Sequence, residues 1–444
     1  MLAKVRTMAN PTTGVSAAIA ALHIVHFMSL SVIDPDGGAP ANLIMEASVD
    51  GTASAALKKL AAGLKTWLDD LLTLAGIAPL GRRDLAGCLG RHSHVLGASW
   101  ASTCSLQGAL GLPFCGSPGM TLGRILAERD LAARIAGMAT LLRGPDRAWN
   151  KLQAVRQALW QAGDAKWAFA PLNAPFLGPA RPRGSLVTAQ ILLAAFPALL
   201  WPLGAVPLLT GLLAWSFGWP SPVTFGLWAV PLTLALAAGS AFLRLRREEA
   251  NDTPEDRAPN PDKVRAVMDK ENQHQLNLLI AVTPIKCGWF RRLTLRGALW
   301  VTGQALARSG RAGFLGDVGV VQYARWLLLP GTRQVVFLSN YDGSWESYLE
   351  DFVNLVPYGP TAIWSNCLGF PRTRLLFGAG AADGDRFRRW VRRHQIPTAF
   401  WYAAYPDLPL GRIRTNAAIR KGIAAARTDT EARAWLALFG AASP

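Results

Sequence analysis

No aspartate, glutamate, lysine, arginine or histidine occurs between Leu186 and Leu243. Two apolar spans of about 20 residues, each long enough to cross the hydrocarbon core of a bilayer, fit inside this stretch. We predict transmembrane helices at roughly 186–212 and 223–243, joined by the turn-forming segment 215–222, whose tryptophans suit a membrane interface. The missing charge indicates an inserted helical hairpin, and a buried hairpin of a soluble protein is the alternative.

Arginine flanks this uncharged stretch on both sides. Arg181 and Arg183 precede it, and Arg244, Arg246 and Arg247 follow it. Positive charge is retained on the cytoplasmic side of membrane helices. We therefore expect a protein of the cell inner membrane, with the lipid bilayer as a partner and both soluble parts in the cytoplasm.

Cysteine is scarce in this chain of 444 residues. The five cysteines are Cys88, Cys104, Cys115, Cys287 and Cys367. No pair has metal-ligand spacing, and an odd number favours reduced thiols over a disulfide framework. His92 and His94 lie near Cys88, but a glycine-rich loop explains them equally well, so no metal site is predicted.

Several catalytic motifs are also missing. The chain has no glycine-rich phosphate loop, no G-x-S-x-G and no zinc-type helix motif, which leaves enzymatic activity open. A net charge of +17 suggests a polyanionic partner, yet no nucleic-acid motif accompanies it. The arginines cluster in 290–300 and 386–394, where attraction to an anionic lipid surface explains them. We expect no nucleic-acid partner.

Four short segments recur in the same order along the chain. The pairs are "LHIVHFMSL" (22–30) with "VQYARWLLL" (321–329), which places His26 against Arg325; "IMEASVDGT" (44–52) with "VFLSNYDGS" (336–344); "CLG" at 88–90 with "CLG" at 367–369; and "SPGMTLGRI" (117–125) with "YPDLPLGRI" (405–413). Ordered recurrence of this kind predicts an internal duplication. Residues 15–33 also resemble a signal anchor, and that alternative to a strand-bearing segment stays open.

The second copy has the clearer pattern. Strand-like runs at 278–286, 320–329, 333–341 and 361–367 alternate with helical runs in the order βαββαβ of ferredoxin-like domains. A helix at 383–395 and a strand at 398–405 follow. The fold class is therefore α+β: two ferredoxin-like domains forming a fused pseudo-dimeric α/β barrel, with the transmembrane hairpin inserted between them.

The expected organisation has six parts. They are a degenerate N-terminal repeat (1–140), a connector (141–185), the hairpin (186–243), a polar linker (244–269), the C-terminal repeat with its terminal helix (270–428) and a tail (429–444).

Each copy has an Asp-Gly-Thr/Ser hinge between a strand and a helix, at 50–52 and 342–344. Glycine permits a sharp turn and Ser or Thr can cap the helix, so a turn explains both hinges. The second hinge is more polar and aromatic, which favours the alternative that it is a functional site. There Asp342 would be a catalytic proton acceptor assisted by Arg325 and Tyr341, with ligand contacts from Asn340 and Trp345.

A second candidate group surrounds the strand that begins near residue 278. Glu271, His274 and Asn277, with Lys286 beyond the strand, would converge to hold a ligand, and His274 would transfer a proton. The alternative is a hydrated approach to the strand. Tyr405, in an aromatic run, is either a ligand contact or part of the core.

Two stretches carry a resemblance to known proteins. "VVQYARWLLLPGTRQVVFLSNYDGSWESYLEDF" and "IPTAFWYAAYPDLPLGRIRTNAAIR" resemble segments of a group of uncharacterised bacterial membrane-associated proteins, which implies no activity. The paired ferredoxin-like domains resemble dye-decolourising-type haem peroxidases at the level of fold. That resemblance implies haem as cofactor and Asp342-Gly343 as the acidic motif, with Ser339 in place of that motif's leading glycine.

Three functions follow as hypotheses. The first is a pocket between the paired domains that binds or acts on a small apolar or lipid-like molecule. The second is a haem-dependent, peroxidase-like oxidoreductase, and the third is a non-catalytic assembly module.

Overall fold

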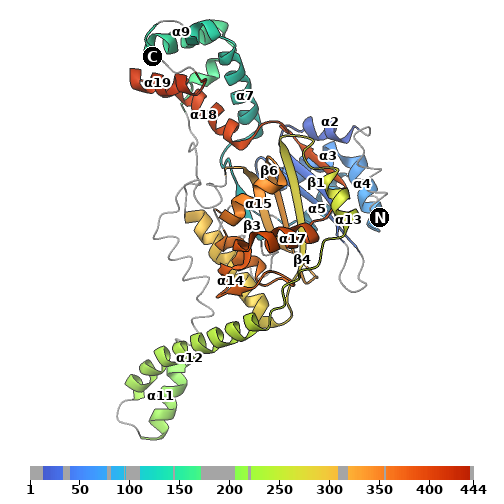
Figure 1. The fold of residues 1–444 in the computed structure, drawn as a ribbon, viewed down its shortest axis with the longest axis vertical. Coiled ribbons are helices and arrows are strands. Elements are labelled where there is room, and N and C mark those ends of the chain that lie inside the picture. Colours follow the sequence, from blue (N-terminus) through green and yellow to red (C-terminus); the bar gives the residue numbers. More distant parts are fainter. Residues whose placement is uncertain are drawn as a thin grey trace.

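The computed structural model describes residues 14–33, 41–77, 82–94, 96, 111–143, 146–171, 206–218, 222–308, 319–354 and 357–440. Two antiparallel sheets lie at the centre, with a helical lobe at one end and a helical hairpin at the other (Figure 1). A small third sheet pairs β7 (Thr373–Arg374) with β8 (Gly378–Ala379) beside the 3-10 helix η4 (Gly380–Ala382). The protein is therefore of mixed α+β class.

The first sheet has the strand order β2-β1-β9, with β1 at Val25–Ile33, β2 at Asn42–Val49 and β9 at Phe400–Ala403. Alternate residues of β1, including Met28 and Leu30, pack against helices. These helices are α2 (Val15–Ala20), α3 (Ala53–Gly63), α4 (Lys65–Leu74) and α5 (Arg82–Arg91). The period of two places apolar side chains on this face of the sheet.

The second sheet has the order β3-β5-β6-β4. Its strands are β3 (Gly111–Cys115), β4 (Leu276–Pro284), β5 (Val321–Leu328) and β6 (Gln334–Asp342). One face packs on α14 (Trp289–Arg308), α15 (Trp345–Asn354), α16 (Tyr358–Trp364) and α17 (Gly384–His394). Aromatic side chains dominate this core, with Trp326 packed against Phe337 at a centroid distance of 4.4 Å.

Each sheet contains a strand from the other half of the chain. β3 precedes the hairpin but pairs with β5, and β9 lies near the C-terminus but pairs with β1. A buried cluster that includes Ile33, Ile280 and Leu338 joins the remaining faces of the two sheets. Neither half therefore has a complete sheet of its own.

The helical lobe consists of α7 (Leu122–Ala136), α8 (Ala139–Arg143), α9 (Ala148–Ala162), α18 (Leu410–Ala425), α19 (Asp429–Ala437) and the 3-10 helix η2 (Lys166–Phe169). These elements share a core that includes Leu152, Ile419 and Trp435. α7 packs alongside α18, so the lobe also combines the two halves of the chain (Figure 1).

The helical hairpin pairs α11 (Val206–Ser216) with α12 (Pro222–Ala250), and α13 (Pro261–Met268) follows. Among the described residues, no helix has both the length and the apolar character needed to cross a bilayer. The predicted transmembrane hairpin, and with it the inner-membrane localisation, is therefore wrong. α11 contains only 11 residues, against the about 20 that a span requires. Residues 186–205 of the predicted first span lie outside the described part.

Two further expectations about the fold are wrong. Residues 361–367 were predicted as a strand, but α16 and the turn after it occupy this region, because a short buried apolar run fits a helix as well as a strand. The last strand of the expected ferredoxin-like domain is instead β9, which joins the other half's sheet. The predicted architecture with an inserted membrane hairpin is thus replaced by an α+β protein with small antiparallel sheets.

The first prediction concerns Gly422, at the contact between α18 and α19. A Cβ atom at this position would lie 2.0 Å from Cδ1 of Trp435. That indole is buried and donates a hydrogen bond to the Ile419 carbonyl oxygen, so it cannot easily move away. Gly422→Ala should lower the free energy of unfolding by about 1–3 kcal/mol, measured by chemical denaturation.

Gly123 in α7 provides the matched control. Nothing lies within 4 Å of a Cβ atom placed there. Gly123→Ala should raise stability by about 0.5–1 kcal/mol through its helix propensity. Equal effects of the two substitutions would show that α19 does not pack on Gly422.

Candidate functional site

The two Asp-Gly hinges make the same contacts. Asp50 accepts a hydrogen bond at Oδ2 from the backbone N–H of Leu122, at 2.8 Å, and its Oδ1 lies 3.0 Å from Nε2 of His26. Asp342 accepts at Oδ2 from the backbone N–H of Leu410, at 2.6 Å, and at Oδ1 from Gln322, at 2.9 Å. Leu122 and Leu410 are the first residues of α7 and α18. Each aspartate therefore ties the end of a strand to the start of a lobe helix.

The register of the strands corrects the sequence alignment. β1 shifts register between Val25 and Phe27, and β5 shifts between Val321 and Tyr323. The bulged residues are His26 and Gln322, and each contacts the hinge aspartate of its own half. His26 thus corresponds to Gln322, and its predicted alignment with Arg325 is wrong. Because both strands carry the bulge, it does not displace one relative to the other; the short apolar runs of β1 and β5 match at more than one offset.

The residues expected to assist Asp342 lie elsewhere. Tyr341 points to the opposite face of β6, where it stacks on Tyr348 with ring centroids 4.1 Å apart. Arg325 forms an ion pair with Glu46, at 2.8 Å between Nη2 and Oε1. Neither side chain contacts Asp342 in the described structure, because successive residues of a strand face opposite ways.

The Arg325–Glu46 pair links the two sheets. Glu46 is 5% exposed and also accepts hydrogen bonds from Ser29 and Ser48. Beside it, Asn340 accepts from the indole N–H of Trp401 at 2.9 Å. The predicted site residues Arg325 and Asn340 therefore belong to polar contacts between strands of different sheets.

The second predicted group does not converge. Glu271 accepts hydrogen bonds from Arg392, at 2.6 Å, and from Gln395, at 2.9 Å. His274 is exposed and lies 3.6 Å from Asp407, on the far side of the turn before β4. Each of these side chains has a partner of its own, so no shared ligand site results.

Asn277 and Trp345 also have local roles. Asn277 accepts from the backbone N–H of Asn272 and donates to the carbonyl oxygen of Gly343, which holds the second hinge. Trp345 packs under the guanidinium of Arg392, which lies 3.7 Å from the ring centroid. These contacts stabilise the polypeptide around β4 and α15.

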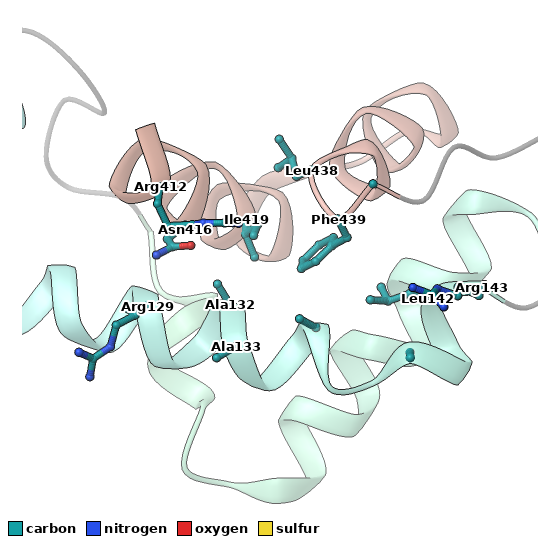
Figure 2. Close-up of a pocket in the computed structure, with 13 residues that line it drawn as sticks. Arg129, Ala132, Ala133, Leu142, Arg143, Arg412, Asn416, Ile419, Leu438 and Phe439 are labelled. Atoms are coloured by element: carbon teal, nitrogen blue, oxygen red, sulfur yellow. The ribbon is translucent and has the colours of Figure 1, made fainter. Parts of the chain in front are cut away.

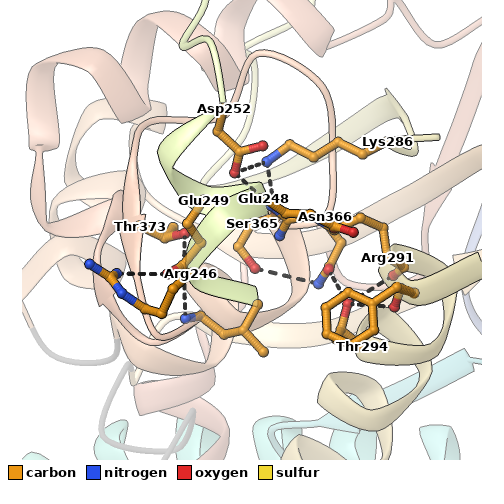
Figure 3. A network of polar contacts seen from close by, with 12 residues as sticks. Arg246, Glu248, Glu249, Asp252, Lys286, Arg291, Thr294, Ser365, Asn366 and Thr373 are labelled. Carbon is orange, nitrogen blue, oxygen red and sulfur yellow. Dashed lines mark hydrogen bonds and ion pairs between the residues drawn. The ribbon is translucent and has the colours of Figure 1, made fainter. Parts of the chain in front are cut away.

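Lys286 belongs to a charged network at the base of α12 (Figure 3). It pairs with Asp252 at 2.7 Å and donates to the Ser365 carbonyl oxygen at 2.6 Å. Arg291 pairs with both Asp252 and Glu248, each at 2.9 Å. Burial lowers the pKa of Lys286, and the hydrogen bond to Asp252 opposes this. The network anchors the hairpin to the body of the protein.

Tyr405 and His26 form a buried chain with the first hinge. The Tyr405 hydroxyl lies 2.9 Å from Nδ1 of His26, whose other ring nitrogen faces Asp50. Tyr323 packs against His26 and hydrogen-bonds Cys115. Burial raises the pKa values of Tyr405 and Cys115, so both keep their protons at neutral pH. We interpret this chain as a structural contact.

A cavity of about 580 Å³ lies in the helical lobe, between α7 and α8 on one side and α18 and α19 on the other (Figure 2). Its walls are mostly alanine and larger apolar side chains, with three arginines and one asparagine. The lining residues are Arg129, Ala132, Ala133, Ala136, Ala139, Leu142, Arg143, Arg412, Asn416, Ile419, Leu438, Phe439 and Gly440. We call this space the lobe cavity.

Polar groups of the lobe cavity lack partners. No hydrogen bond joins the Asn416 side chain to another described residue, and its amide atoms open into the cavity, since they are not among the fully buried polar atoms that lack a partner. Within the described chain, no carboxylate pairs with Arg412 or Arg143, whereas Arg129 pairs with Asp130 at 2.8 Å. A buried amide normally has a hydrogen-bonding partner. Asn416 is therefore a candidate contact for a bound molecule.

Sequence reasoning missed the lobe cavity. Its walls come from segments separated by nearly three hundred residues, and its alanines have no chemical signature. The only available signal was the recurrence of "LGRI" at 122–125 and 410–413, which aligns Arg124 with Arg412 and Glu128 with Asn416.

The lobe cavity offers no axial ligand for haem among its described lining residues. The lining of the lobe cavity contains no histidine, cysteine, methionine or tyrosine that could be an axial ligand. Both oxygens of Asp342 are bonded to Gln322 and Leu410, and both ring nitrogens of His26 have partners. In the part of the chain that was described, no group of three His, Cys, Asp or Glu side chains has the arrangement of a metal site.

Comparison with protein-family models, curated proteins and solved structures finds no match to this chain. Function is therefore inferred from the geometry alone.

The second prediction concerns the pH dependence of stability at Asp342. Burial raises the pKa of this carboxyl from 3.8 to about 6, against the hydrogen bonds from Gln322 and Leu410. The pKa of Asp342 is higher in the folded protein than in the unfolded chain. Protonation of this carboxyl therefore stabilises the folded protein fully below about pH 4, and this stabilisation is lost as pH rises through about 6. At neutral pH the ionised carboxylate costs up to about 3 kcal/mol.

Asp342→Asn removes this titration. The asparagine oxygen can still accept from Leu410, and its amide can donate to Oε1 of Gln322 after that side chain turns over, which gives up the hydrogen bond from Gln322 to the Leu408 carbonyl oxygen. The variant should gain stability relative to the wild type between about pH 5 and pH 8, as measured by denaturation at each pH. A constant difference across this range would contradict the assigned pKa.

The third prediction concerns Arg325. Arg325→Leu leaves the Glu46 carboxylate buried without its partner and should cost about 3–5 kcal/mol of unfolding free energy. Adding Glu46→Gln removes the uncompensated charge and should recover part of that loss. Additive effects in a double-mutant cycle would show that the ion pair does not couple the two sheets.

Proposed function

We propose that this protein binds a small apolar or lipid-like molecule in the lobe cavity. The observation that carries the proposal is an open space of about 580 Å³ with a mostly apolar lining, between helices from both halves of the chain. Pockets of this size and character are typical of small-molecule sites. The space between the sheets is a weaker candidate, because Ile280, Leu338 and the Arg325–Glu46 pair occupy it.

The lining supports binding rather than catalysis. Arginine is the only ionisable residue type in it, and an arginine side chain stays protonated at any physiological pH. No nucleophile, general base or general acid therefore faces the cavity among its described lining residues. The chemistry available is burial of apolar surface, worth roughly 25 cal/mol per Å², and attraction of negative charge.

Small residues on α7 create the space. Ala132, Ala133 and Ala136 line the space from α7, with Ala132 directed toward α18 (Figure 2), while Ile419, Leu438 and Phe439 supply larger apolar surface from the other wall. The hinge aspartates fix where α7 and α18 begin, so the walls are held by the two sheets. A preformed cavity of this kind lowers the entropic cost of binding.

The fourth prediction tests the lobe cavity with a neutral fluorescent probe, N-phenyl-1-naphthylamine, and with its displacement by 1-decanol. Ala133 lines the cavity but is itself exposed, so Ala133→Trp should fill the space without disturbing the core. Affinity for the probe should fall at least about tenfold, because the indole occupies the volume that the probe needs.

Ala434→Trp is the matched control. Ala434 is an exposed alanine on α19 outside the lining, so this variant should bind the probe like the wild type. Equal binding by both variants would place the probe elsewhere and overturn the proposal.

A further inference from the structure

α7 and α18 are corresponding helices that differ in one local respect. Both begin with Leu-Gly-Arg-Ile, both start at a hinge aspartate and they pack side by side. Aligning Leu122 with Leu410 matches Arg124 with Arg412, Glu128 with Asn416 and Ala132 with Arg420. Two such helices related by an approximate two-fold axis make each cross-helix contact twice, once on each side.

On one side of the helix pair the contact is filled. Glu128 of α7 is fully buried and accepts from Nε of Arg124 at 2.8 Å. Arg420 reaches across from α18 and donates to the same oxygen at 3.2 Å, while its guanidinium lies over Trp167. On this side, the Glu128 carboxylate lies between the guanidinium groups of Arg124 and Arg420. The long side chain of Arg420 fills the remaining space between the two helices.

On the other side the matching residues leave a space. The residue that corresponds to Arg420 is Ala132, whose side chain is too short to cross to the other helix. The residue that corresponds to Glu128 is Asn416, which is neutral. Both residues line the lobe cavity together with Arg412. The cavity is therefore the unfilled counterpart of the Arg124–Glu128–Arg420 contact, without its carboxylate and without its long side chain.

We propose that a linear carboxylic acid fills this space, with its carboxylate on Arg412 and Asn416 and its hydrocarbon chain along the apolar wall. The proposal rests on the proposed function, because it names the chemical class of the molecule bound in the same cavity. Arg412 has no carboxylate partner among the described residues, and the buried Asn416 amide has an N–H donor to offer. A ligand carboxylate would accept a hydrogen bond from Arg412 as the Glu128 carboxylate accepts one from Arg124.

The layout of the cavity matches an amphipathic ligand. Arg412 and Asn416 lie at one end, Ile419 follows along α18, and Phe439 and Leu142 lie toward the other end, where Arg143 lies beside Leu142 (Figure 2). Arg129 is nearer the first end, but its guanidinium pairs with Asp130 at 2.8 Å. A molecule with an acidic head and an extended apolar chain can satisfy both ends at once.

The fifth prediction compares decanoate with 1-decanol, which has the same chain without the charge, by displacement of the naphthylamine probe well above the pKa of the free acid. Wild-type protein should bind decanoate more tightly than decanol. Arg412→Met should weaken decanoate binding roughly 10- to 100-fold, as expected for loss of a charge-assisted hydrogen bond, and leave decanol binding unchanged.

Asn416→Glu is the second variant. It gives Arg412 the partner that Arg124 has in Glu128, so it should abolish the preference for decanoate while decanol still binds. Arg433→Met is the control, because Arg433 lies on α19 outside the lining and pairs with Asp429. Thermal unfolding of each variant, followed by circular dichroism, separates a lost contact from a lost fold.

The outcomes distinguish the two proposals. A preference for decanoate that disappears in Arg412→Met and Asn416→Glu supports the carboxylate site. Equal binding of decanoate and decanol in the wild type, with no effect of Arg412→Met, overturns the carboxylate site and leaves the apolar cavity standing. Failure of both compounds to displace the probe overturns both proposals.

Discussion

A carboxylate at the end of a strand holds the first backbone amide of a distant helix, and this contact occurs twice in the protein. Asp50 bonds to Leu122 across 72 residues and Asp342 to Leu410 across 68. Each contact satisfies one of the N–H groups that a helix start leaves unpaired, and places negative charge at the positive end of the helix dipole. The orientation of the helical lobe, and so the shape of its cavity, depends on these two contacts.

Strand exchange makes the two halves inseparable. Because β3 completes the sheet of β5 and β9 completes the sheet of β1, neither hinge can form in an isolated half with its sheet intact. The Arg325–Glu46 pair adds a charged contact between the same sheets, and its buried carboxylate makes slippage of one sheet over the other costly. The rigid base for the lobe is therefore the interlocked pair of sheets rather than either sheet alone.

Sequence patterns predicted the parts of this structure in which a short motif has a direct backbone role. Asp-Gly between a strand and a helix is of this kind, and both copies mark real corners of the chain. The alignment of β1 with β5 was wrong because short apolar runs match one another at several offsets, and the bulges that identify His26 with Gln322 are not visible in the sequence. Helix α16 was mistaken for a strand because residues 361–366 are buried on every face. Absence of charge in 186–243 showed apolar composition, but not where a helix begins or ends, and α11 is too short for the span expected of it.

The candidate site was harder to predict than the fold. Tyr341 and Asp342 are neighbours in sequence, but they face opposite sides of β6. Their closeness along the chain therefore gave the wrong prediction that Tyr341 assists Asp342. The lobe cavity arises from a difference between two matching helices rather than from any motif: Ala132 replaces a long side chain and Asn416 replaces a carboxylate. The Arg420–Glu128 contact already joins α7 to α18 on one side, so the matching positions on the other side can remain apart. Because Ala132 and Asn416 do not form the corresponding contact, a cavity opens between the helices. Its wall keeps Arg412, the positively charged residue that corresponds to Arg124.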